Sequence, residues 1–403
     1  MKFATSAAIC LLVVGFQSTA SAKSPSEFLR EAAVNNGLVN PTELNEIFDP
    51  KLADIGETIF NSKSFSLNGN ISCQNCHLEK FGSADGIPNA IGIGGTGEGA
   101  SRILKGGAVL PRNTLPLWGR GWSKFKTFFW DGRVDFSAGK RISQFGASAP
   151  SDDPLLIAIH LPVVEIREML AEDKFISSNK KEDITAAGNV YAAVIENMIE
   201  KHEEEMTQLG QLRNKKLSQI SFPDLAVAVR DFFRRKFALK PYKFSEFVFN
   251  EGDLSDIETR GGLLFYGKAK CAVCHSGPIL SDLNFHVIPF YQLGAGKNGF
   301  GIDYGRFNVT HNPNDLYRFR TPPLLNVSKT APYGHSGGAP TLAHAITSHF
   351  DPLHHVNVKK IDLLARSELY KKISRSSEVL SLVPALKPKE VESIVAFLET
   401  LEF

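Results

Sequence analysis

Sulfur-containing side chains are scarce in this sequence. The 403 residues include 5 cysteines and 4 methionines, and no methionine follows Met206. An excess of charge of one sign is also absent, because the formal net charge is only +2. A nearly neutral chain without a polybasic run has no electrostatic basis for binding nucleic acid or an anionic membrane surface. With 43% hydrophobic and 22% charged residues, the composition is that of a globular protein, and the length allows two domains.

Beyond its N-terminus, the sequence lacks an apolar run long enough to cross a bilayer. The one candidate, residues 7–16, follows Lys2 and has about half of the ~20 residues that a spanning helix needs. Residues 20–22 (ASA) then form a small-x-small cleavage site. We therefore predict a secretory signal peptide over residues 1–22, with a membrane anchor as the alternative. The mature chain is expected in the periplasm, without a membrane span.

Loss of the signal peptide removes Cys10, and the four cysteines that remain all belong to C-x-x-C-H motifs. These motifs occupy residues 73–77 (CQNCH) and 271–275 (CAVCH). The spacing is typical of covalent haem c attachment, in which the histidine is the proximal iron ligand. A redox dithiol or a four-cysteine zinc site would leave both histidines unexplained. We predict two haem c groups, held by Cys73, Cys76 and His77 and by Cys271, Cys274 and His275.

The two motifs indicate an internal duplication. Each is preceded by glycine and phenylalanine four positions apart, Gly56 with Phe60 and Gly261 with Phe265. This spacing places both side chains of a pair on one face of a helix. The predicted fold is mostly α, with two cytochrome c-like haem domains and long irregular loops. The predicted domains are residues 23–225 and residues 226–403.

Apolar periodicity predicts several helices between the loops. In the first of them, the apolar stripe contains Leu52, Ile55, Ile59 and Phe60. Residues 241–256 are predicted to be a polar connector, and residues 82–107 a glycine-rich loop with a functional role. The segments predicted to be helical are residues 23–62, 186–209, 222–240 and 389–402, and residues 277–325 are predicted to be rich in turns.

The N-terminal half lacks a candidate for the second axial ligand of its iron. No histidine occurs between His77 and His160, and no methionine occurs between Met1 and Met169. An iron with a free coordination position can bind peroxide, whereas two strong protein ligands favour electron transfer. We predict that the first haem is five-coordinate. Ligation by His160, or by a lysine or a tyrosine, is the alternative.

The C-terminal half has no methionine, which excludes ordinary His/Met ligation from within that domain. Its histidines are numerous, and one of them or a tyrosine is expected to complete a six-coordinate haem. The histidines that follow the second motif are His286, His311, His335, His344, His349, His354 and His355.

Further motifs make the chain resemble the bacterial di-haem cytochrome c peroxidase and MauG (methylamine utilisation) family. The resemblance covers most of the mature chain and implies that peroxide reacts at the N-terminal haem. It also implies that the C-terminal haem supplies or stores electrons. The motifs, besides the two C-x-x-C-H sequences, are residues 112–113 (RN), 129–133 (FWDGR), 162–169 (from Pro162 to Glu168-Met169) and 330–337 (TAPY with His335 and Gly337).

The resemblance assigns roles to three residues of the N-terminal half. It places Trp130 between the haems, where an indole assists electron transfer. It places Glu168 over the open iron, where a base moves a proton between the two peroxide oxygens. Glu165 is the alternative for this base. Pro162, six residues before Glu168, matches the family's spacing.

The sequence departs from the family at two positions. The glutamine that the family often has ten residues before its glutamate is replaced by Ala158, and His160 is a possible substitute. The distal ligand of the second haem, Met in peroxidases and Tyr in MauG, falls nineteen residues after Thr330, which is His349. Imidazole in place of thioether is expected to lower the reduction potential. The competing distal ligands are Tyr317, His354 and His355.

The family also holds a calcium ion between its domains, through oxygen atoms of an asparagine and of threonine and proline backbones. The matching residues here are Asn113, Thr330 and Pro332. Hard oxygen ligands of this kind suit calcium. A turn-capping role is the alternative for Asn113.

These observations predict a periplasmic di-haem c-type peroxidase. It would reduce hydrogen peroxide with electrons from a small periplasmic donor protein, and it would be a monomer or a homodimer. The alternative is a MauG-like enzyme that uses peroxide-derived high-valent haems to oxidise aromatic residues of a partner protein. The missing methionine and Ala158 favour this alternative. A non-catalytic di-haem electron carrier is a third hypothesis, which the missing distal ligand of the first haem disfavours.

Overall fold

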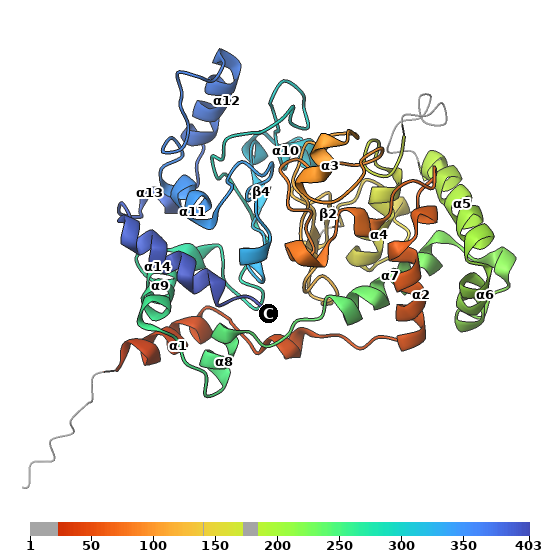
Figure 1. Cartoon of the computed structure of the whole chain (residues 1–403), viewed down its shortest axis with the longest axis horizontal. Coiled ribbons are helices and arrows are strands. Elements are labelled where there is room, and N and C mark those ends of the chain that lie inside the picture. The colour runs from red at the N-terminus through yellow and green to blue at the C-terminus, as the bar shows by residue number, and fades with distance from the viewer. Residues whose placement is uncertain (1–22, 140, 172–183) are drawn as a thin grey trace, which may run out of the picture.

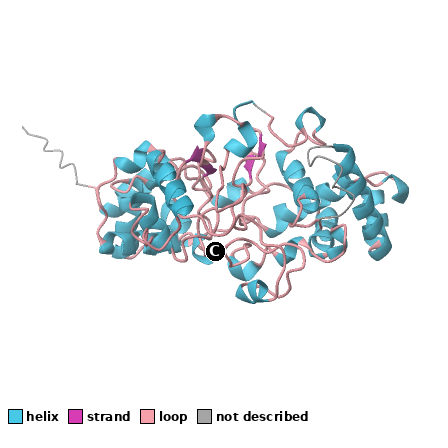
Figure 2. Cartoon of the chain, turned by 90° about the horizontal axis from the view of Figure 1, so that it is seen from above, coloured by secondary structure: helices cyan, strands magenta, loops and turns pink. Residues whose placement is uncertain are grey.

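The structure is a computed structural model that describes residues 23–139, 141–171 and 184–403. The predicted signal peptide, residues 1–22, lies outside the described residues. Helices gather at both ends of an elongated molecule, and loops occupy its centre (Figures 1 and 2). The predicted, mostly α fold is confirmed. None of the described helices has both the length and the apolar composition needed to span a bilayer.

The helices and strands of the described residues follow one another with long loops between them. Both sheets are antiparallel pairs of very short strands, β1 with β2 and β3 with β4. The helices of the first half are α1 (Pro25–Asn35), α2 (Pro50–Asn61), α3 (Ala100–Leu104), α4 (Pro154–Val164), α5 (Ile184–Lys201), α6 (Glu203–Leu212) and α7 (Phe222–Lys236). The helices of the second half are α8 (Lys243–Phe249), α9 (Asp256–Tyr266), α10 (Phe307–Thr310), α11 (Leu342–Phe350), α12 (Leu363–Ser374), α13 (Glu378–Ser381) and α14 (Pro388–Glu399). The strands are β1 (Thr127–Phe128), β2 (Val134–Asp135), β3 (Phe285–His286) and β4 (Phe319–Arg320).

The N-terminal half is built on the crossing of α2 and α7. The side chain of Asp49 caps α2 by accepting hydrogen bonds from the first backbone N–H groups of the helix. A Cβ atom on Gly56 would overlap the carbonyl oxygen of Ala228 on α7, so the crossing requires glycine at this position. The predicted apolar stripe of α2 is buried, and its members are Leu52, Ile55, Ile59 and Phe60.

The C-terminal half repeats this crossing with α9 and α14. A Cβ atom on Gly261 would overlap the carbonyl oxygen of Ser393 on α14. The aromatic packing is also repeated, because the rings of Phe60 and Phe232 and those of Phe265 and Phe397 are both 5.1 Å apart between centroids. The interplanar angles are 46° and 49°. Each C-x-x-C-H motif therefore follows the same helix crossing, as an internal duplication predicts.

Residues 23–62 do not form the continuous helix that their periodicity predicts. Gly37 adopts a φ of +83°, which ends the helical course after α1, and α2 begins only at Pro50. Helix α1 packs on α9, at the opposite end of the molecule from α2 (Figure 1). Because α7 packs on α2, the predicted domain boundary between residues 225 and 226 falls inside a helix of the N-terminal crossing. The domain limits stay a prediction.

The prediction of a polar connector over residues 241–256 is wrong, because this segment contains α8. Phe244 and Phe247 of α8 are buried. Phe244 meets Phe397 of α14 edge-on, with ring centroids 4.8 Å apart. Two buried aromatic residues three positions apart define the inner face of α8, and the polar residues around them obscure this face in the sequence.

Buried ion pairs join the two halves at the centre of the molecule. Arg112 binds both carboxylate oxygens of Asp303, with N–O distances of 2.8 and 2.9 Å. Arg306 binds Asp135 at 2.7 Å. Both pairs link a residue near the predicted haem sites of the first half to the 303–306 segment of the second. The loops that carry these sites are thereby held against each other.

Candidate functional site

The first C-x-x-C-H motif opens onto a cavity of about 820 Å³, and Cys73, Cys76 and His77 line it. Nδ1 of His77 donates a hydrogen bond to the carbonyl oxygen of Ser83 at 2.9 Å. This contact fixes the ring and leaves Nε2 with its lone pair free to bind a metal. Burial lowers the pKa of His77 to about 4, so the imidazole is neutral near pH 7. A neutral, oriented imidazole is suited to ligate iron.

The second motif has the same design. Cys271, Cys274 and His275 line a narrower cavity of about 190 Å³. Nδ1 of His275 donates to the carbonyl oxygen of Leu280 at 3.2 Å, and burial lowers the pKa of His275 to about 4. The second imidazole is therefore also neutral, with Nε2 available.

His349 lines the second cavity from α11. Its Nδ1 donates to the carbonyl oxygen of Ala345 one turn earlier, at 2.7 Å, so its Nε2 is available too. The competing candidates lie elsewhere in the described structure. Tyr317 is buried and donates its hydroxyl hydrogen to Glu368 at 2.7 Å. The remaining two, His354 and His355, are exposed and do not line the cavity.

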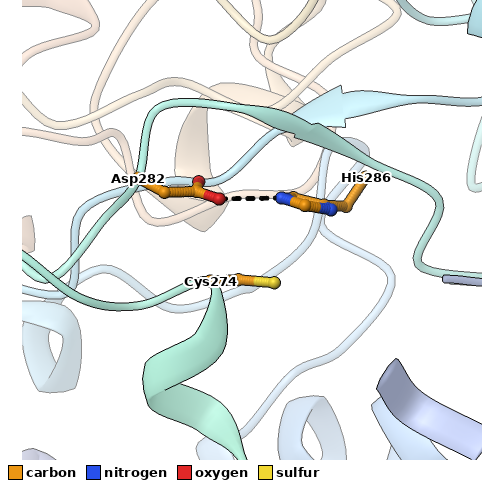
Figure 3. Close-up of side chains that lie close together, drawn as sticks. All are labelled: Cys274, Asp282 and His286. Carbon is orange, nitrogen blue, oxygen red and sulfur yellow. Dashed lines mark hydrogen bonds and ion pairs between the residues drawn. The ribbon is translucent and has the colours of Figure 1, made fainter. Parts of the chain in front are cut away.

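A third polar group adjoins the second motif, as Figure 3 shows. His286 and Asp282 are joined by a hydrogen bond of 2.9 Å, and the sulfur of Cys274 lies beside them. Cysteine, aspartate and histidine together are a possible metal-binding set. In the predicted haem attachment, Cys274 would form a thioether bond, which would leave no thiolate for a metal ion. We therefore assign His286, which lines the second cavity, to the wall of that cavity.

Each cavity is lined by a buried arginine, and the surroundings of these arginines indicate whether the cavities suit haem. Arg120 lines the first cavity and Arg320 the second. Both are almost fully buried, and in each case Nη2 has no hydrogen-bond partner among the described residues. Burial lowers the pKa of Arg320 to about 9, and burial together with the charge of Arg320 lowers that of Arg120 well below its usual range. A guanidinium stays protonated, so it favours an anion at its side. The carboxylate groups of haem propionates meet this need, and the residues present fit the group.

Glu168 lines the first cavity from the loop that follows α4. Burial, and secondly repulsion by Glu165, raise the pKa of Glu168 to about 7. The loop is held by the glycine-rich segment, because the backbone N–H of Ile93 donates to the carbonyl oxygen of Arg167 at 3.0 Å. A Cβ atom on Gly92 would overlap the same carbonyl oxygen. The glycine-rich loop therefore has a definite task, which is to let two backbone segments meet beside Glu168.

Charged side chains continue the wall of the first cavity. Arg133 contacts Glu165 at 3.2 Å and Asp131 at 3.2 Å. Asp131 is fully buried and also contacts Arg112 at 2.5 Å. Burial would raise the pKa of Asp131, but the charges of Arg112, Arg133 and Lys297 outweigh it and hold this pKa well below its usual range. The W-D-G-R segment thus fixes the guanidinium of Arg133 next to the carboxyl pair.

Trp130 lines both cavities and is only 8% exposed. Its indole Nε1 donates to the carbonyl oxygen of Asn113 at 2.9 Å. Its own carbonyl oxygen accepts from the backbone N–H of Arg320 at 2.8 Å. The indole is therefore fixed between the two halves, in the wall that the cavities share.

The first cavity has few further donor atoms. Ala158 and Pro162 line it, whereas His160 does not. The His160 ring is buried against Phe222, with centroids 4.7 Å apart, so it does not take the place of the missing glutamine. Besides His77, the described residues of the lining include others with side chains of a kind that can bind iron. Among them are Met169, through sulfur, and Lys297, through nitrogen. Met169 packs within the hydrophobic core.

The predicted calcium ligands lie together beside the second cavity. Asn113, Thr330 and Pro332 all line it. The side-chain amide of Asn113 donates to the carbonyl oxygen of Pro332 at 2.6 Å. This hydrogen bond satisfies the amide, and the calcium ion stays a prediction.

Comparisons with known proteins identify the family to which the sequence is similar. Residues 50–253, half of the chain, match the family described as di-haem cytochrome c peroxidase. Cytochrome c peroxidase Ccp of Escherichia coli is 26% identical over 303 residues, which cover 74% of this chain and 52% of that protein. The chain therefore spans about half the length of this relative. The methylamine utilization protein MauG of Methylorubrum extorquens is 24% identical over 384 residues, which cover 94% of this chain and 84% of that protein.

A solved structure shows the same fold. The crystal structure of the diheme peroxidase BthA from Burkholderia thailandensis superposes with a TM-score of 0.64, over 91% of this chain and 89% of that chain, at 19% identity. The duplicated helix crossing, the paired C-x-x-C-H motifs and the match over residues 50–253 lead to one conclusion. The chain belongs to the di-haem cytochrome c peroxidase family.

Proposed function

We propose that this protein is a di-haem c-type peroxidase that acts on hydrogen peroxide in the first cavity. One observation carries the proposal. A neutral histidine of a C-x-x-C-H motif, His77, and a carboxyl group with a pKa of about 7, Glu168, line the same cavity. A peroxide site needs both an iron ligand and a base that can gain and lose a proton near neutral pH.

The cofactors would be held by the residues already described. Cys73 and Cys76 would form the thioether bonds of the first haem, and His77 would bind its iron. When bound, the two haem groups would supply the redox chemistry, with peroxide as the oxidant at the first and electrons passing through the second. We propose that His275 and His349 would both bind the second iron, because both line the second cavity.

Glu168 would carry out the acid–base step. Heterolysis of hydrogen peroxide requires that one oxygen lose its proton and that the other leave as water. With a pKa of about 7, the Glu168 carboxylate can accept the first proton and return it to the leaving oxygen. Arg133, held by Asp131 and Glu165, adds positive charge to the same wall, which favours the anionic forms of peroxide. Pro162 would shape this wall.

Trp130 would couple the two sites. Its indole lines both cavities and is fixed by a hydrogen bond to Asn113. Electrons that pass between the two cavities would cross the wall that contains this ring. The aromatic ring would shorten the part of that path that runs through saturated side chains. Electrons would come from a small exported redox protein, and the protein itself would act in the periplasm.

A MauG-like activity, the oxidation of aromatic residues in a partner protein, is the second candidate. It is favoured by His349 in the second cavity, where an imidazole would lower the reduction potential, and by Ala158 in the wall of the first. A low potential makes the second haem a poorer acceptor of electrons from small donor proteins.

Peroxide consumption by the haem-loaded full-length protein tests the proposal and separates the two candidates. We expect turnover with a reduced small cytochrome c as donor. A requirement for prior reduction supports the peroxidase. A long-lived oxidised species after peroxide is added to the fully oxidised protein supports the MauG-like activity. If peroxide is not consumed and the spectrum of the protein does not change, both candidate functions are contradicted.

A further inference from the structure

One wall residue of the first cavity belongs to the second half of the chain, and the proposed function does not use it. Lys297 lines the cavity together with its neighbours Ala295 and Gly296. Its side chain is 29% exposed, and its ammonium nitrogen lies 3.7 Å from a carboxylate oxygen of Asp131. A distance of 3.7 Å is too long for a hydrogen bond.

Asp131 has two counter-charges that lie closer to it than Lys297 does. Its carboxylate already receives Arg112 at 2.5 Å and Arg133 at 3.2 Å. Within the part of the chain that the structure describes, Lys297 has no side-chain hydrogen bond at normal distance. Apart from its ion pair with Asp131, the ammonium group lies in the lining of the first cavity.

The loop that carries Lys297 is closely fixed. The backbone N–H of Gly301 donates to the carbonyl oxygen of Ala295 at 2.7 Å, which closes a tight turn. The side chains of Asn298 and Asn308 exchange hydrogen bonds of 2.8 and 3.1 Å, which tie the turn to α10. A Cβ atom on Gly296 would overlap the carbonyl oxygen of Ile302, so the turn depends on glycine there. The backbone that carries Lys297 is thereby fixed by contacts within the loop and with α10.

Lys297 and Glu168 line the same cavity, so the positive charge of the ammonium group favours the carboxylate form of Glu168. Glu165 raises the pKa of Glu168, whereas Arg133 and then Lys297 lower it. Burial, followed by repulsion from Arg133, lowers the pKa of Lys297 to about 8, while Asp131 opposes this change. Lys297 therefore remains mostly protonated at pH 7. The charged groups that face it are Asp131, Arg133, Arg112 and Glu165.

We propose that Lys297 is a positioning residue for Glu168. From the second half of the chain it sets a positive charge in the wall of the first cavity, and this charge favours the carboxylate form of Glu168. The acid–base chemistry of the N-terminal site would then depend on the docked 294–302 loop of the C-terminal half. The inference rests on the proposed function of Glu168.

The test compares K297M with K297R in the haem-loaded full-length protein. K297M removes the charge and keeps a long side chain, whereas K297R keeps the charge. K360M serves as the control, because Lys360 is exposed and does not line the cavity. Two quantities are measured for each protein. One is the pH midpoint of Glu168 protonation, which infrared difference spectroscopy measures. The carboxyl band of Glu168 is identified by its absence from the spectrum of E168Q. The other is the pH profile of the second-order rate constant for peroxide.

We expect K297M to raise the infrared midpoint and to shift the rising limb of the rate profile to higher pH. A shift of one pH unit would lower the rate about tenfold on that limb, and it would leave the plateau at high pH nearly unchanged. K297R is expected to restore both quantities, and K360M to match the wild type.

Identical infrared midpoints in wild type and K297M would overturn the proposal. So would a change of the first haem from low spin to high spin in K297M, because Lys297 would then be an iron ligand. A purely structural role would lower the rate equally at all pH values. If E168Q reacts with peroxide at the wild-type rate, the proposed role of Glu168 fails, while the infrared midpoint still reports whether Lys297 acts on this carboxyl group.

Discussion

A carboxyl group can act as a base and an acid near neutral pH only when its surroundings raise its pKa. Glu168 meets this condition through burial and through the nearby charge of Glu165, which bring its pKa to about 7. Glu165 itself contacts Arg133 at 3.2 Å. Both carboxyl groups line the first cavity, but Glu165 is paired with Arg133, whereas burial raises the pKa of Glu168 to about 7. This difference favours Glu168 over Glu165 for the proposed acid–base role.

Replacement of Glu168 by glutamine tests this assignment. We expect E168Q to slow the reaction with peroxide by a factor on the order of 10² to 10⁴, the usual contribution of a general acid–base group. In the wild type the rate should rise with pH through about 7, because the carboxylate is the active form. E168Q should lose this rise. Stopped-flow kinetics between pH 5 and pH 9 measure both effects.

The matched control for this experiment is E165Q, which removes the neighbouring carboxylate. Loss of its negative charge should lower the pKa of Glu168 and move the rising limb to lower pH. If E165Q abolishes the reaction and E168Q leaves it intact, the roles of the two residues are exchanged.

At the scale of single residues, the sequence predicts a functional role only for residues that belong to a motif. The haem-binding cysteines and histidines follow from their spacing, and Glu168, Trp130 and Pro162 from a family resemblance. It does not predict Arg120, Arg320 or Lys297. Single basic residues have no spacing that marks them, and only the fold reveals that the two arginines are buried without a carboxylate partner among the described residues.

At the scale of helices, close crossings determine where the haem motifs lie. Gly56 lets α2 approach α7 so closely that any side chain would overlap a backbone carbonyl group. Gly261 does the same for α9 and α14. Backbone atoms cannot move aside as a flexible side chain can, so both crossings depend on glycine.

The variant G56A is expected to lower the free energy of unfolding by roughly 1–3 kcal/mol or more, the usual cost of overpacking. The variant G188A is the control, because Gly188 lies in α5 with open space around the position of its Cβ atom. It should instead stabilise the protein by roughly 0.5–1 kcal/mol, since alanine favours the helix. Denaturant unfolding of both variants measures the difference. Equal stability of G56A and wild type would contradict the described crossing.

Helix prediction succeeded where one face is apolar and failed elsewhere. The stripe of α2 has one buried face and was predicted correctly. Helix α4 was not predicted, because nearly all of its residues are buried and its sequence has no polar face to show a period. Helix α8 was missed because it is only seven residues long. Residues 186–209 were predicted as one helix, which breaks at His202 between α5 and α6.

At the scale of the whole molecule, a few buried ion pairs hold the two halves together. Arg112 binds Asp303 through two contacts and Asp131 through a third. Burial would raise the pKa of Asp303, but Arg112 outweighs it and lowers this pKa below its usual value. Asp303 therefore stabilises the fold above the pKa that it has in the unfolded chain. This stabilisation is lost as the pH falls through the lowered, folded-state value.

The variant D303N tests the contact between the halves. It leaves a buried guanidinium partly unpaired, so we expect a loss of roughly 3–5 kcal/mol at pH 7. The loss should shrink under acid conditions, where Asp303 is protonated in the wild type. D152N is the control, because Asp152 forms an exposed pair with Arg141, and such pairs contribute about 0–1 kcal/mol. A D303N variant as stable as D152N at pH 7 would contradict the role of this pair.

The sequence predicts the duplication, but it does not predict which segments of the chain pack in which half of the molecule. The paired motifs indicate two similar units, and the repeated helix crossing agrees with them. Helix α1 nevertheless packs on α9. Such long-range contacts leave no local pattern, which is why the boundary predicted after residue 225 falls inside α7.

The central claim is that the first iron keeps an open coordination position, while His275 and His349 ligate the second. Electron paramagnetic resonance of the oxidised, haem-loaded full-length protein tests it most directly, together with the variant H349A. The account predicts one high-spin and one low-spin ferric signal in the wild type, and loss of the low-spin signal in H349A. Two low-spin signals in the wild type, or a low-spin signal unchanged in H349A, would contradict it.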